Sequence, residues 1–183
     1  QTESGWSLDF SAGVGYSNID YRLDGTVNPS MGPESPLSFS PGDVSQVERT
    51  VNFDASRQYH TWLEEPVNVA VGAEWRRETY HQQAGDRASW FTGPYAYDAN
   101  SDATTGLSVG SNGFPGYQPQ SEGHWSRNNW ALYADVELLL ATNWQAGFAT
   151  RFEHFSDFGA TFDGKFTTRF ALTDTLALRG SVS

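Results

Sequence analysis

The chain has 183 residues, a formal net charge of −11 and no cysteine. The negative charge argues against nucleic acid as a partner, because phosphates attract cationic surfaces. The absence of cysteine excludes disulfides and thiolate metal sites. Mean hydropathy is −0.54, and no run of about 18 apolar residues predicts a transmembrane helix. Membrane-spanning β-strands are not excluded, because each strand needs only about 9–11 residues and presents every second side chain to lipid.

Apolar and polar side chains alternate along about seven segments, which we interpret as strands with one apolar and one polar face. In the first segment Trp6, Leu8 and Phe10 alternate with Ser7 and Asp9. In chain order the apolar positions lie within 6–16, 51–55, 67–75, 132–138, 144–152, 162–170 and 176–182. No segment has a clear period of 3.6 residues, so the predicted fold class is all-β.

The connections between these segments differ greatly in length. Long loops are expected at about 24–45 and 82–122, whereas the turns at 141–143 and 173–174 are short. Transmembrane barrels have short periplasmic turns and long extracellular loops, while an immunoglobulin-like sandwich spaces its turns more evenly. The sequence therefore predicts an antiparallel up-and-down meander that forms part of a transmembrane β-barrel.

The polar face carries charges of both signs, among them Glu74 and Arg151. Such a face suits a hydrated barrel lumen, and it equally suits the solvent face of a soluble sheet. The two interpretations differ in what surrounds the apolar residues, for example Ala12, Val71 and Ala134. On the outside of a curved sheet these residues are exposed, whereas in a soluble binding module they converge in a closed interior.

Several segments resemble the barrel of TonB-dependent outer-membrane receptors. Residues 66–80 and 129–137 are similar to the strands that enter and leave a large loop of that family. Residues 151–161, Arg-Phe-Glu-His-Phe-Ser-Asp-Phe-Gly-Ala-Thr, are similar to the family hairpin RYE.YSDFG.T. Residues 177–183 resemble the stretch before its TGFRAPS segment, and the loop at 28–39 resembles an extracellular loop of this group.

The resemblance implies a barrel of about 22 strands whose lumen holds a plug domain. Residues 1–183 would supply part of that barrel, both chain ends being cuts, and no plug domain is recognisable. The implied location is the outer membrane of a Gram-negative bacterium. The implied function is uptake of a siderophore, cobalamin, haem or an oligosaccharide, with outer-membrane lipid, the plug, TonB and the ligand as partners. The alternative function is that of a soluble β-rich carbohydrate-binding module.

The loop at 82–122 holds the candidate ligand-binding residues, six aromatic side chains among Gly, Pro, Ser and Asn: Trp90, Phe91, Tyr95, Tyr97, Phe114 and Tyr117. Rings on an extracellular loop can stack on sugars or on the apolar parts of a siderophore. The same rings could instead pack the loop against itself, as in an Ω-loop.

No catalytic site, metal site or cofactor is expected. Residues 98–102 have the D-x-N-x-D opening of a calcium loop, but Ala103 and Val109 stand where Gly and Glu would be required, so an acidic turn is favoured. The four histidines are scattered without the spacing of metal ligands. The chain also has no G-x-S-x-G, P-loop or dinucleotide motif, and an enzyme is the least favoured interpretation.

Overall fold

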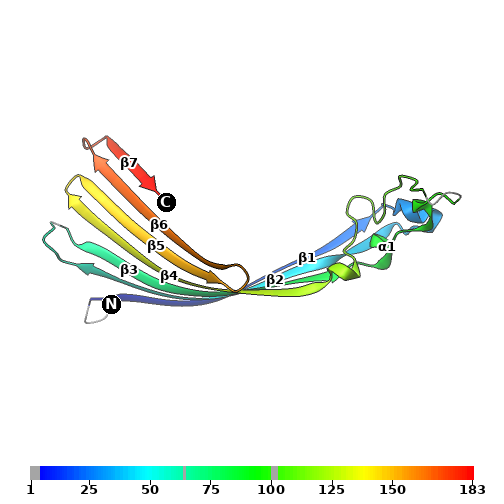
Figure 1. Cartoon of the computed structure of the whole chain (residues 1–183), viewed down its shortest axis with the longest axis horizontal. Coiled ribbons are helices and arrows are strands. Elements are labelled where there is room, and N and C mark those ends of the chain that lie inside the picture. Colours follow the sequence, from blue (N-terminus) through cyan, green and yellow to red (C-terminus); the bar gives the residue numbers. More distant parts are fainter. Residues whose placement is uncertain (1–4, 64, 100–102) are drawn as a thin grey trace. The chain divides into compact units, whose positions relative to one another are not determined.

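The fold is a single antiparallel sheet in a computed structural model that describes residues 5–63, 65–99 and 103–183. Seven strands are hydrogen-bonded in the order of the sequence, and Figure 1 shows β4 to β7 side by side. The strands are β1 (Ser7–Asp24), β2 (Ser38–Tyr59), β3 (Val67–Ala84), β4 (Gly123–Ala141), β5 (Trp144–Phe155), β6 (Gly159–Ala171) and β7 (Ala177–Val182). The predicted all-β meander is thus confirmed.

Short helical segments lie in the two long loops. They are η1 (Pro29–Glu34), α1 (Arg87–Trp90), η2 (Pro94–Ala96) and η3 (Pro119–Ser121). Proline begins three of them, because its fixed φ suits the first helical position and its missing N–H leaves no bond unmade there. None of the described helices is both long enough and apolar enough to cross a membrane.

Strand β2 begins earlier than the sequence pattern suggests, so about the last third of the expected loop at 24–45 is strand. Pro41 and Gly42 gave that segment the composition of a loop. In the structure Pro41 is buried, and Gly42 has a φ of +119°. A Cβ on Gly42 would lie 2.4 Å from the carbonyl oxygen of Gln83. The backbone of Gln83 therefore leaves no room for a side chain at Gly42. This glycine is needed inside a strand and does not indicate a loop.

The chain divides into two compact units, which we describe separately. The wall unit comprises residues 1–14, 48–78 and 127–183, and in its described part it consists of strands and short turns. The loop unit comprises residues 15–47 and 79–126 and contains the two long loops.

The apolar face of the wall unit is uncovered. Strand register aligns large apolar side chains in rows, one of which contains Val136, Phe148, Phe166 and Val182. Phe148 is 53% exposed and Phe162 in a neighbouring row is 72% exposed. Ala12 and Val71 are exposed as well, and Ala134 is half-buried among its neighbours. The described rows do not converge in a closed interior, so the expectation of a soluble binding module is not met.

On the opposite, polar face a glycine makes room for a tyrosine ring. A Cβ on Gly72 of β3 would lie 2.2 Å from the ring of Tyr133 on β4. Arg151, the register partner of Tyr133 on β5, places its guanidinium 5.9 Å from the centre of that ring. The ring thus fills the space that Gly72 leaves, and the guanidinium approaches it from the next strand.

This packing predicts that Gly72→Val lowers the free energy of unfolding by about 1–3 kcal/mol, because the ring of Tyr133 must move from its site. Gly164→Val is the matched control, since Gly164 is also a strand glycine of the wall unit and has no heavy atom within 4 Å of its Cβ position. Urea unfolding followed by tryptophan fluorescence measures both variants. Equal stability of the two would contradict this account of the packing.

Candidate functional site

A buried polar cluster around Asn28 joins the two long loops. Asn28 and Ser30, in the first loop, are both 0% exposed. The side-chain amide of Asn28 donates to the carbonyl oxygens of Ala88 and Phe91 in the second loop, at 2.9 Å each. The hydroxyl of Ser30 donates to Asn28 Oδ1 at 2.7 Å and accepts from the N–H of Gly93 at 2.9 Å. The cluster therefore cross-links two segments that are distant in sequence.

The second loop is also folded back on itself by its serines. The carbonyl oxygen of Ser89 accepts from the N–H groups of Ser111 and Gly116, each at 2.8 Å. Asp86 caps the helix α1 by accepting from the N–H of Ser89 at 2.8 Å, and its second oxygen accepts from the N–H of Ser40 at 2.6 Å. Buried polar groups are costly unless they are paired, so these bonds hold one backbone arrangement.

Two of the six predicted ligand-binding residues pack inside the loop unit. Phe114 stacks on Tyr21 with ring centres 4.7 Å apart, and Tyr117 meets Phe114 edge-on at 5.6 Å. Desolvation, assisted by a hydrogen bond with Tyr21, raises the pKa of Tyr117 above its usual value. The phenol therefore stays neutral at physiological pH, as suits a packed ring.

Two more of the six predicted residues, Trp90 and Phe91, make contacts within the second loop. The indole Nε1 of Trp90 donates to the carbonyl oxygen of Gly85 at 3.0 Å. The ring of Phe91 is covered by the guanidinium of Arg87, which lies 4.3 Å from the ring centre. For these four residues the contacts favour packing within the loop unit.

Tyr95 and Tyr97 differ from the other four because they are 49% and 52% exposed. They line a recess of about 590 Å³ together with Pro94, Asp98, Ala99, Thr105 and Leu107. Two contacts hold Tyr95 in place, one to its backbone and one to its ring. The hydroxyl of Thr105 donates to its carbonyl oxygen at 2.7 Å, and its ring lies against Gly32, where a Cβ would approach to 2.6 Å.

The polar face of the wall unit carries a network of opposite charges. Arg151 contacts Glu74 at 3.4 Å and Glu153 at 2.5 Å. Arg76 Nη2 lies 2.8 Å from Glu74 Oε1 and forms an ion pair with it. The N–H group does not point at this oxygen, so the contact is not a hydrogen bond. Farther along the same face, Arg127 pairs with Glu78. The carboxylates of this network are thus matched by guanidinium groups on the same strand or on a strand one or two positions away in the sheet.

The structure contains no metal-binding cluster of three or more His, Asp or Glu residues within its described ranges. Part of the acidic turn predicted at 98–102 falls on residues 100–102, which lie outside these ranges, so that turn stays a prediction. His81 and His124, which look unrelated in sequence, are neighbours with ring centres 5.9 Å apart. The pairing of β3 with β4 brings them together, and no local sequence signal reveals it.

The Asn28 cluster predicts that Asn28→Ala loosens the second loop, because two buried carbonyl groups lose their donor at a cost of about 1–3 kcal/mol. Hydrogen exchange of the N–H groups of α1 and η2 should become faster. Asn112→Ala is the matched control, since Asn112 is an exposed asparagine of the same loop. Unchanged exchange in the Asn28 variant would show that other contacts fix the loop.

Comparison with known proteins agrees with this architecture. Residues 1–183 match the family described as "TonB dependent receptor-like, beta-barrel". No curated protein matches the chain. The match covers all seven strands and both long loops. Members of this family are receptors and transporters of the Gram-negative outer membrane that take up nutrients. The chain therefore belongs to the TonB-dependent receptor family, as part of its β-barrel.

Proposed function

We propose that the chain forms a section of the barrel wall and a ligand-gathering surface of a nutrient receptor in the outer membrane. The observation that carries this proposal is the pair of exposed rings, Tyr95 and Tyr97, on a loop that is otherwise fixed by buried hydrogen bonds. Exposed rings on a mobile loop would lose much conformational freedom on binding. Rings on a fixed backbone lose little, which favours affinity.

The recess beside these rings favours a neutral ligand with flat apolar faces. Its described lining contains no Lys or Arg, and Asp98 is its one charged residue. Tyrosine rings stack on such faces, while hydroxyl and backbone groups supply hydrogen bonds. An oligosaccharide, or a siderophore that presents its uncharged side, suits this chemistry better than an anionic ligand does.

We place outer-membrane lipid against the apolar face of the wall unit. The exposed rows that include Phe148 and Phe162 have no cover from the described chain, and large uncovered apolar surfaces are rare on soluble monomers. The polar face, with its ion pairs, would then face a hydrated lumen. In the longer protein, the family implies a plug domain in that lumen and TonB as the source of energy. Residues outside this chain would supply both functions.

The lipid assignment predicts that Phe148→Arg costs about 2–4 kcal/mol of stability in phospholipid vesicles, because a cation near the bilayer midplane loses its hydration. Exposure of Phe148 to water would instead make the same substitution nearly harmless. Ala149→Arg is the matched control, since Ala149 is the next residue and lies on the polar face opposite Lys165 and Asp135. Urea unfolding of the vesicle-embedded protein measures both, and equal stability would argue against lipid at this face.

The binding proposal predicts that Tyr95→Ala combined with Tyr97→Ala weakens ligand binding by about tenfold or more, since each stacking contact contributes about 0.5–1.5 kcal/mol. A panel of oligosaccharides and ferric siderophores, titrated calorimetrically against the detergent-solubilised protein, supplies the ligand and the dissociation constant. Tyr16→Ala controls for the loss of an exposed ring, because Tyr16 is 70% exposed on β1. An unchanged dissociation constant in the double variant would rule out these two rings.

A further inference from the structure

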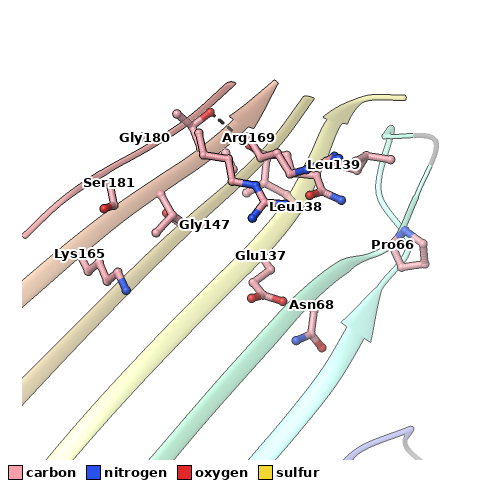
Figure 2. A pocket seen from close by; sticks show the side chains of 15 residues that line it. Pro66, Asn68, Glu137, Leu138, Leu139, Gly147, Lys165, Arg169, Gly180 and Ser181 are labelled. Atoms are coloured by element: carbon pink, nitrogen blue, oxygen red, sulfur yellow. Dashed lines mark hydrogen bonds between the residues drawn. The ribbon is translucent and has the colours of Figure 1, made fainter. Parts of the chain in front are cut away.

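A second recess lies on the polar face of the wall unit and is lined by strands β3 to β7 (Figure 2). Its volume is about 680 Å³. Three of the chain's 11 basic residues, Lys165, Arg169 and Arg179, line it. Glu137 is the one acidic residue in this lining. A chain with a net charge of −11 therefore places a local excess of positive charge at this point.

Strand register sets two of these cations directly against each other. Arg169 on β6 is paired with Arg179 on β7, and its partner on the other side is Gln145 on β5. Like charges at directly opposed positions destabilise a sheet. Both lateral neighbours of Arg169 are thus known, and neither of them is a carboxylate.

The unpaired state of these cations contrasts with the rest of the polar face. Arg76, Arg127 and Arg151 each contact a carboxylate on this face. Across the described residues, none of the three recess cations makes an ion pair within 4.0 Å, and neither does Glu137. Carboxylates of the sheet therefore neutralise Arg76, Arg127 and Arg151. Within the described residues, no carboxylate neutralises the recess arginines.

A negative charge that lies on the face of the sheet would reach all three cations, whereas a strand paired with the free edge of β7 would lie beside Arg179 alone. Lys165 has Ala149 as its partner on β5, so lateral pairing does not neutralise it either. The hydroxyls of Thr167 and Ser181 are paired in register between Lys165 and the two arginines, and they add hydrogen-bonding groups to the same surface. Figure 2 shows Lys165, Glu137 and Asn68 projecting from the same side of the sheet.

We propose that this recess is a docking site for an acidic polypeptide segment, whose carboxylates lie between Arg169 and Arg179 and beside Lys165. Arginine binds carboxylates through two parallel hydrogen bonds, and such charge-assisted bonds are the strong ones. A polypeptide fits better than a small anion, because the recess is open and spans five strands. The proposal concerns the wall unit and is independent of ligand binding at Tyr95 and Tyr97.

The test uses the fact that Lys165 is the only lysine of the chain. A carbodiimide condenses a lysine amine with a touching carboxylate into an amide, with loss of water. Applied to the full-length receptor in outer-membrane vesicles, it should join Lys165 to an Asp or Glu outside these 183 residues. Mass spectrometry of the digested protein identifies the joined peptides. Lys165→Arg keeps the charge and should abolish this product.

The two arginines provide the second arm of the test. Arg169→Gln combined with Arg179→Gln should reduce the yield of the Lys165 product about tenfold, since the acidic segment loses its main partners. Arg77→Gln is the matched control, because Arg77 is an exposed arginine outside the recess, and its yield should match the unmodified protein. The proposal is overturned if no peptide is joined to Lys165, if the joined residue lies within these 183 residues, such as Glu137 or Asp163, or if it lies on the barrel strand that pairs with β7.

Discussion

One constraint underlies the whole structure, namely the strict alternation of side chains across a continuously hydrogen-bonded sheet. A shift of register by one residue would move every side chain of a strand to the opposite face. The pairing of β4, β5, β6 and β7 without such a shift, apart from one irregularity near Leu139 and Ala141, keeps the apolar rows and the charged network on separate faces. Exposed phenylalanines on one side and paired carboxylates on the other follow from the same register.

Much of the fold could be predicted because alternation is a local property of the sequence. Each strand was recognised from its own residues, and so was the contrast between long loops and short turns. The errors occurred where a distant contact decides the local structure. Pro41 and Gly42 look like loop residues until the approach of Gln83 is known, and this approach depends on the pairing of β2 with β3.

The candidate site shows the same limit more sharply. Six rings in one loop looked equivalent in sequence, yet their contacts separate them, and three of the six have a partner outside that loop. Tyr21, on β1, packs against Phe114 and Tyr117, and Gly32 in the first loop supports one side of Tyr95. The cationic recess was missed for a related reason. Lys165, Arg169 and Arg179 alternate with apolar residues as in any strand, and only the register shows that they have no carboxylate beside them.

The length of β5 has a consequence for the membrane that this barrel section fits. Trp144 begins the strand, and Trp130 lies opposite His154 near its other end. At about 3.4 Å per residue, the strand between Trp144 and His154 measures about 34 Å. A tilt of about 40°, typical of such barrels, projects this length onto about 26 Å along the membrane normal. The two indole rings are thus spaced to sit at the opposite headgroup layers of a bilayer with a hydrocarbon core of about 25 Å.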